Sequence, residues 1–305
     1  SLRKNKDAGP FYKRRFIRLY PPYITALLWA MLVFGIIRWL MPQLTDGTYA
    51  TPNLDRLKDS NQLYNWKVIL QNLFYLPQLD GILRPFWSLT MEVIFYLLAP
   101  YVFRNKKIYF ISSIILFLAA MAFSHFNWKP NTIVHNFMYF NIFFAIGVAL
   151  YDNFDRALEK LKIFKTYKAP LIAIGIFFAM IWVSLIITDE TIPSFMAAVM
   201  SMILIIYLLS NNLQIKWLIG VGRFSYTLYI THLPTVYLYM MLFFMITPAE
   251  PPYIYSSVVF IPCVFFCLGI AYLQYLLVEK RSKMVLDKLR GNKGKEKVVE
   301  KVAAF

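Results

Sequence analysis

Residues 84–100, RPFWSLTMEVIFYLLAP, are apolar enough for a membrane, yet they carry a carboxylate near their middle. Ser88, Glu92 and Tyr96 follow an i, i+4, i+8 spacing, so they form one polar stripe on a helix. A charge inside a bilayer costs about 2.5–3.5 kcal/mol or more, so it normally faces protein or water. The stripe therefore predicts a functional cavity. The alternative is a hydrogen bond or ion pair between helices that only holds a bundle together.

A second polar stripe lies in residues 222–239, GRFSYTLYITHLPTVYLY. Ser225, Tyr229 and His232 follow an i, i+4, i+7 pattern and can share one helix face. From the helical rise, the depths of His232 and Glu92 in a bilayer differ by about 8 Å. Histidine exchanges protons near neutral pH, so we predict that both residues line one cavity and perform acid–base chemistry. The alternative is a structural histidine that is bonded to a neighbouring helix.

Arginines gather just before the first long apolar run, in FYKRRFIRLY at residues 11–20. Arg14 and Arg18 are spaced i, i+4 and share a helix face, while Arg15 lies to the side. Guanidinium groups bind phosphates through two parallel hydrogen bonds, so the cluster is a candidate phosphate site. Membrane topology alone would also place basic residues at this edge.

The composition indicates the kind of element that must position these groups. Of 305 residues, 59% are hydrophobic and 16% are charged, whereas soluble domains are nearer 45–50% apolar. Apolar runs long enough to cross a bilayer recur along the chain. The predicted fold is all-α: a polytopic integral membrane bundle of about eight transmembrane helices. The predicted spans are 21–41, 86–103, 108–124, 136–150, 169–187, 193–209, 225–246 and 253–278.

The formal net charge of +16 follows the predicted topology and does not indicate a nucleic-acid partner. Most of the 32 Lys and Arg residues lie in the segments 1–20, 104–107, 151–168, 210–223 and 279–305. This positive-inside pattern predicts that both termini are cytoplasmic and that the basic edge faces anionic membrane lipids. Cys263 and Cys267 lie on one predicted helix without other metal-ligating residues nearby, so we expect neither a disulfide nor a metal site.

We divide the chain into a membrane domain over residues 1–283 and a charged, disordered cytoplasmic tail over residues 284–305. Residues 66–79 are too short to span, so we expect them to lie at the membrane interface or to re-enter the membrane.

Three motifs, in order, resemble the integral-membrane acyltransferase-3 family. The arginine-rich entry to one of the family's helices resembles FYKRRFIRLYPPY. A segment of the family that begins with tryptophan-serine-leucine and contains a glutamate resembles RPFWSLTMEVIFYLLAP. A third segment, which begins with serine-tyrosine and ends with histidine-x-proline, resembles GRFSYTLYITHLPTVY. VEKRSKM resembles the closing segment, with Lys280 in place of the usual proline. The resemblance covers about residues 11–283.

The resemblance implies a membrane O-acyltransferase, which in this family commonly moves an acetyl group from cytoplasmic acyl-CoA to a hydroxyl. The implied acceptor is a carbohydrate: an envelope polysaccharide, a lipid-linked glycan or a small glycoside. Acyl-CoA would act as donor substrate with no bound cofactor, in a bacterial cytoplasmic membrane. The arginines would receive the coenzyme A phosphates. Together with the polar stripes, the resemblance gives five candidate catalytic residues: Glu92, His232, Ser88, Tyr226 and Tyr229. Of these, Ser88, Tyr226 and Tyr229 would orient the substrate.

The family usually places two further helices, with a catalytic histidine, before the arginine-rich motif. We therefore expect residues 1–305 alone to be inactive in acyl transfer. Two other classes stay open: a glycan or lipid transporter, and a non-catalytic membrane scaffold. A transporter would be indicated by internal repeats and paired broken helices, and the sequence contains neither.

Overall fold

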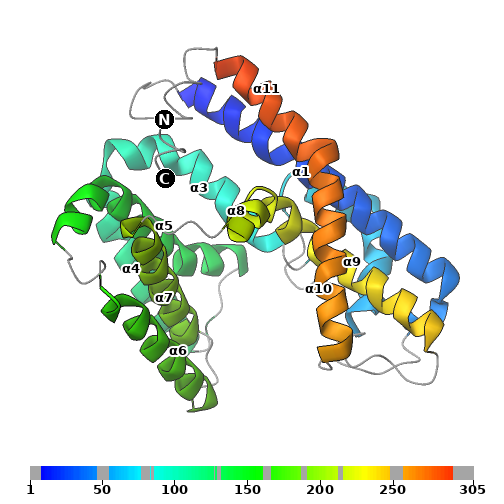
Figure 1. The fold of residues 1–305 in the computed structure, drawn as a ribbon. Helices are drawn as coiled ribbons and strands as arrows, with labels where there is room; N and C mark the ends of the chain where they lie inside the picture. The colour runs from blue at the N-terminus through cyan, green and yellow to red at the C-terminus, as the bar shows by residue number, and fades with distance from the viewer. Residues whose placement is uncertain are drawn as a thin grey trace. The chain divides into compact units, whose positions relative to one another are not determined.

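The computed structural model describes residues 8–46, 55–76, 83, 86–126, 128, 132–160, 166–186, 191–211, 216–247 and 257–290. No strand occurs among these residues, and Figure 1 shows the helices. In chain order the elements are α1 (Ala8–Leu40), η1 (Pro42–Leu44), η2 (Asp55–Tyr64), α2 (Trp66–Leu73), α3 (Trp87–Arg104), α4 (Lys106–His125), α5 (Thr132–Lys160), α6 (Lys168–Ile186), α7 (Thr191–Ser210), α8 (Lys216–Gly222), α9 (Ser225–Ile246), α10 (Ser257–Gln274), η5 (Tyr275–Glu279) and α11 (Lys280–Arg290).

The helices confirm an all-α polytopic membrane protein. In the described part of the chain, four helical segments are long and apolar enough to cross a membrane: Ala8–Leu40, Lys106–Ser124, Ser225–Ile246 and Val259–Lys288. Shorter apolar helices cover Ile133–Ala149, Lys168–Val183 and Val199–Leu208. Each predicted span falls largely within one observed helix, although the number eight and the cytoplasmic position of both termini stay predictions.

The chain divides into two compact units. One unit contains residues up to Arg104 and from Gly220 onward, and the other contains Asn105–Ile219. In the first unit, α9 packs against both α1 and α10, and α11 lies beside α1. In the second unit, α4 pairs with α5 and α6 pairs with α7. All the residues predicted to do chemistry belong to the first unit.

Helix α1 runs without interruption through the arginine cluster and through Pro21 and Pro22. Both prolines lie in the interior of the helix, where each removes one backbone hydrogen bond. The surrounding bundle holds the helix together, with Pro22 buried and the Thr25 hydroxyl donating to the Pro21 carbonyl at 2.9 Å.

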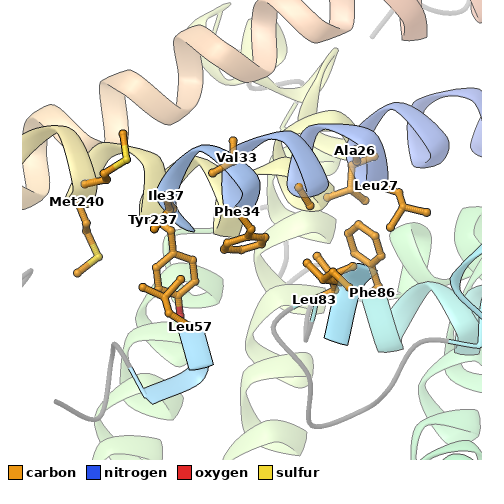
Figure 2. Close-up of a cluster of buried hydrophobic side chains, with 14 of the residues drawn as sticks. Ala26, Leu27, Val33, Phe34, Ile37, Leu57, Leu83, Phe86, Tyr237 and Met240 are labelled. Atoms are coloured by element: carbon orange, nitrogen blue, oxygen red, sulfur yellow. The ribbon is translucent and has the colours of Figure 1, made fainter. Parts of the chain in front are cut away.

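The hydrophobic core of the first unit lies along one side of α1 (Figure 2). Its buried side chains come from α1, from α9 and from the segments between α1 and α3. Labelled members include Ala26, Leu27, Val33, Phe34, Ile37, Leu57, Leu83, Phe86, Tyr237 and Met240. Because α1 carries the arginines near its start and this core farther along, it links the predicted phosphate site to the most buried part of the unit.

Part of the predicted outer loop, residues 42–65, folds back onto α1. The hydroxyl of Tyr64, at the end of η2, donates to the Met31 carbonyl at 2.6 Å. A Cβ at Gly35 would lie only 3.0 Å from that hydroxyl, so glycine permits the close approach. Burial raises the pKa of Tyr64 and so favours the protonated donor, although the nearby Arg38 acts in the opposite direction.

Two helical segments extend beyond the predicted spans. Helix α5 continues to Lys160, into the basic segment 151–168. After α10 the chain continues through one turn of π-helix, η5, into α11, which ends at Arg290. The first residues of the predicted tail are therefore helical, and residues 291–305 lie outside the described part of the chain.

Replacing Phe34 with Ala should destabilise the first unit by about 3–5 kcal/mol, because the cavity left in a close-packed core removes contacts that lipid cannot replace. Phe34 is 0% exposed, whereas Leu32 on the same helix is 56% exposed and serves as the control for Leu→Ala replacement. Thermal unfolding in detergent measures both. Equal melting temperatures for the two variants would contradict the core described above.

Candidate active site

Glu92 is held by a chain of polar contacts that joins α3 to α1. The Tyr96 hydroxyl, one turn along α3, donates to Glu92 Oε1. The Arg15 Nη1 group of α1 donates to the Tyr96 hydroxyl at 3.3 Å, and the guanidinium carbon lies 4.3 Å from the centre of the Tyr96 ring. The carboxylate is half-buried, and the Tyr96 hydroxyl bridges it to a cation through two hydrogen bonds. The polar stripe predicted from the sequence therefore exists, with Arg15 as its partner on the neighbouring helix.

The structure gives the three arginines different surroundings. Arg15, which the spacing placed to the side of the cluster, is the one that reaches α3. Arg18 is exposed and interacts electrostatically with Tyr96, while Arg14 is half-buried. Arg14 makes no hydrogen bond or ion pair with any described residue. The role of Arg14 and Arg18 in phosphate binding stays a prediction.

Two tyrosines of α9 tie that helix to the others. The Ser88 and Tyr229 hydroxyls lie 2.7 Å apart, which joins α3 to α9. The Tyr226 hydroxyl donates to the Leu19 carbonyl of α1 at 3.1 Å, and it lies close enough to Glu92 to feel its charge. Ser88, Tyr226 and Tyr229 thus lie where α1, α3 and α9 meet, and their catalytic role stays a prediction.

His232 lies in the same part of the bundle but does not touch the carboxylate. Its Nδ1 is 2.7 Å from the Tyr229 carbonyl, and the centres of the two rings are 6.0 Å apart. A carbonyl only accepts, so Nδ1 carries the proton and Nε2 of the neutral ring is the basic nitrogen. No hydrogen bond joins His232 to Glu92 among the described residues. Tyr229, between Ser88 and His232, connects the two predicted groups.

A cavity of about 170 Å³ opens between the start of α1 and the second half of α3. Its lining is mostly apolar, with polar atoms from a few side chains, and consists of Tyr12, Arg15, Phe16, Leu19, Tyr75, Val93, Tyr96 and Leu97. The Tyr12 hydroxyl donates to the Leu97 carbonyl at 2.9 Å and ties the two walls together. The cavity therefore adjoins the polar chain that ends at Glu92.

Tyr75 is a cavity residue that the sequence did not single out. It follows α2, the short helix formed within the segment 66–79 that was predicted to lie at the interface or re-enter. Tyrosines of α1 cap the carbonyls at the end of α2, with the Tyr23 hydroxyl 2.7 Å from the Asn72 oxygen and the Tyr20 hydroxyl 3.4 Å from the Leu73 oxygen. These bonds pack the end of α2 against α1 and bring Tyr75 to the cavity.

Glu279 in η5 is a buried carboxylate that was not among the predicted site residues. It is 4% exposed, accepts a hydrogen bond from the Thr227 hydroxyl and forms an ion pair with Lys283 at 2.7 Å. The Lys283 ammonium also donates to the Arg223 carbonyl at 2.8 Å. This group joins the last helix to the start of α9.

The sequence did contain a signal for this contact. Thr227, Thr231 and Thr235 repeat the i, i+4, i+8 spacing that drew attention to Glu92. All three are buried, and Thr235 accepts a hydrogen bond from the Trp29 indole at 3.0 Å. Helix α9 therefore has two polar faces, one toward α3 and one toward α1 and the last helix.

The arrangement suits proton transfer beside an apolar pocket. A carboxylate and a neutral imidazole are available as bases, and tyrosine hydroxyls and a guanidinium group are available as donors. Among the described residues, no group of three or more His, Cys, Asp or Glu side chains could hold a metal ion.

Comparison with known proteins gives one match. The family model Acyl_transf_3, described as an acyltransferase domain, matches residues 1–275. No curated protein and no solved structure matches the chain significantly. The match includes the arginine cluster and both polar stripes, and it bears out the resemblance drawn from the motifs.

Replacing Lys283 with Leu should destabilise the protein by about 2–3 kcal/mol, because it leaves Glu279 buried without a counter-charge. The double variant Glu279→Gln/Lys283→Leu should recover most of the loss, since it removes the unpaired charge. The exposed neighbour Lys280, changed to Leu, is the control. Thermal unfolding of purified protein checks all three. A single Lys283 variant as stable as the parent would show that the ion pair contributes nothing.

Proposed function

The chain belongs to the acyltransferase family whose model covers residues 1–275, and we propose that it is an O-acyltransferase that acylates a carbohydrate hydroxyl. The donor is cytoplasmic acyl-CoA, with acetyl as the acyl group. The acceptor is a hydroxyl of an envelope glycan, a lipid-linked sugar or a small glycoside. The protein would work in a bacterial cytoplasmic membrane.

The observation that carries this proposal is the cavity beside the Arg15–Tyr96–Glu92 chain. Its apolar walls suit an acyl thioester and exclude water that would hydrolyse it. The guanidinium group of Arg15 lies on the same wall as Tyr96, next to further arginines on α1 that suit the phosphates of coenzyme A.

In the proposed reaction, the acceptor oxygen attacks the carbonyl carbon of the thioester. A base takes the proton of the acceptor hydroxyl as the new C–O bond forms. We assign this role to Glu92, with His232 Nε2 as the second base of the site. The C–S bond then breaks, and the thiolate of coenzyme A takes up the proton. Ser88, Tyr226 and Tyr229 orient the acceptor between α3 and α9.

The direct test is transfer of radiolabelled acetyl from acetyl-CoA to membrane glycans. It should be run on cells that express residues 1–305 alone and on cells that express the full-length protein. Transfer that depends on the expressed protein supports the proposal. No transfer in either case, with the protein present in the membrane, would contradict it.

Replacing both Arg14 and Arg18 with Gln should weaken acyl-CoA binding by about tenfold or more, because hydrogen bonds to charged groups contribute about 1.5–3 kcal/mol each. Lysines at the same positions should restore only part of the affinity, since an ammonium cannot bind a phosphate through a planar fork. Lys168→Gln, at an exposed basic residue of α6, is the control for loss of a positive charge elsewhere. Unchanged affinity in the double Gln variant would leave the arginines with a topological role only.

Glu92→Gln should lower kcat by about 100-fold or more, since general acid–base catalysis commonly contributes a factor of about 100 to 10,000. Gln retains the size and can still accept from Tyr96, so the melting temperature should change little. Asp287→Asn, at an exposed carboxylate of α11, should leave turnover unchanged. Glu92→Gln with full turnover would exclude the acid–base role. Glu92→Leu should instead reduce stability, because Tyr96 loses its acceptor.

A further inference from the structure

Tyr75 occupies a backbone position that ordinarily belongs to glycine. It is the residue after the C-cap of α2, where the Tyr75 N–H reaches the Asn72 carbonyl at 3.0 Å and the Leu76 N–H reaches the Gln71 carbonyl at 2.8 Å. These two bonds define a Schellman motif, whose central residue adopts a left-handed conformation. Tyr75 has a φ of 57°, and it is the only non-glycine residue with positive φ in the described part of the chain.

A tyrosine at this position costs free energy that glycine would not, because its Cβ crowds the backbone. The surrounding structure holds the conformation in place. The Thr90 hydroxyl donates to the Tyr75 carbonyl at 2.6 Å, and the Tyr23 ring stacks on the Tyr75 ring with centres 4.2 Å apart. Residues with strained backbone conformations cluster at functional sites. The strain at Tyr75 therefore raises the question of why a tyrosine occupies this position in place of glycine.

The side chain itself faces the cavity between α1 and α3. Its lining includes Tyr75 with Arg15 and Tyr96, and the Tyr75 hydroxyl interacts electrostatically with Glu92. That hydroxyl makes no hydrogen bond with any described residue, although its neighbours Tyr20, Tyr23 and Tyr226 all donate to backbone carbonyls. Packing alone would be served by phenylalanine. The hydroxyl is a donor that is left available to whatever fills the cavity.

We propose that Tyr75 is a catalytic residue of the acyl transfer, and that its hydroxyl donates a hydrogen bond to the carbonyl oxygen of the donor thioester. This inference rests on the proposed function. When the acceptor oxygen adds to the carbonyl carbon, the electron pair of the C=O bond moves to that oxygen. The resulting oxyanion accepts a stronger hydrogen bond from Tyr75 than the thioester did. The pair returns as the C–S bond breaks, and Tyr75 keeps its proton throughout.

The left-handed conformation serves this role because it fixes the position of the donor before the substrate arrives. A donor that is already oriented does not have to reorganise as charge develops, and it acts at its strongest in a cavity with few competing waters. The Schellman bonds, the Thr90 bond and the Tyr23 stack all constrain one residue. Removing the hydroxyl therefore tests the role without disturbing these constraints.

The test compares Tyr75→Phe with the unsubstituted full-length protein in acetyl transfer from acetyl-CoA. We expect kcat to fall by about 100-fold, as for loss of one oxyanion donor, with KM for acetyl-CoA and the melting temperature nearly unchanged. Tyr101→Phe is the control, since Tyr101 is an exposed tyrosine of α3 outside the cavity lining, and it should retain kcat within about twofold.

Tyr75→Gly guards against a packing effect of the Phe variant. Glycine adopts the left-handed conformation without strain, so the variant should fold, and it should show at least the kcat loss of Tyr75→Phe. Full kcat in either Tyr75 variant, with transfer by the unsubstituted protein intact, would overturn this inference and leave the proposed function standing. Equal losses in Tyr101→Phe and Tyr75→Phe would also overturn it. No transfer by the unsubstituted protein would instead contradict the proposed function, and this inference with it.

Discussion

A helix surrounded by hydrocarbon has no water with which to satisfy its polar groups, and this constraint governs the first unit. Two carboxylates, Glu92 and Glu279, lie among apolar helices. Each accepts a hydrogen bond from a hydroxyl on a helix, and each has a basic side chain nearby, Arg15 in one case and Lys283 in the other. The contacts that neutralise the charges are the same contacts that hold the helices together.

The two carboxylates differ in how completely they are enclosed. Glu279 is buried and its ion pair is direct. Glu92 is only half-buried, and its cation lies behind Tyr96. The catalytic role that we propose therefore falls on the carboxylate whose counter-charge is indirect and whose hydrogen-bond partner Tyr96 lines a cavity.

Tyrosine is the residue that makes this arrangement possible. Its ring packs against apolar neighbours while its hydroxyl reaches a polar group, so one side chain serves the core and satisfies the backbone. Tyr20 and Tyr23 cap the end of α2, and Tyr226 reaches a carbonyl of α1. These bonds bring a short helix that cannot span the membrane against the long helices, and they position Tyr75 beside the cavity.

The sequence by itself determined the all-α membrane fold, because an apolar run of bilayer length must be helical to satisfy its own backbone. It also predicted the stripe around Glu92, because the i, i+4 spacing is a local property of a helix. The tertiary structure alone decided which side chains from different helices meet. That Arg15 rather than Arg14 or Arg18 reaches Tyr96 depends on how α1 is rotated against α3, and that Glu279 lies beside Thr227 depends on the packing of α9 against the last helix. The sequence did not predict Tyr75 as a site residue for the same reason. Its left-handed backbone and its place in the cavity arise only when α2 packs against α1.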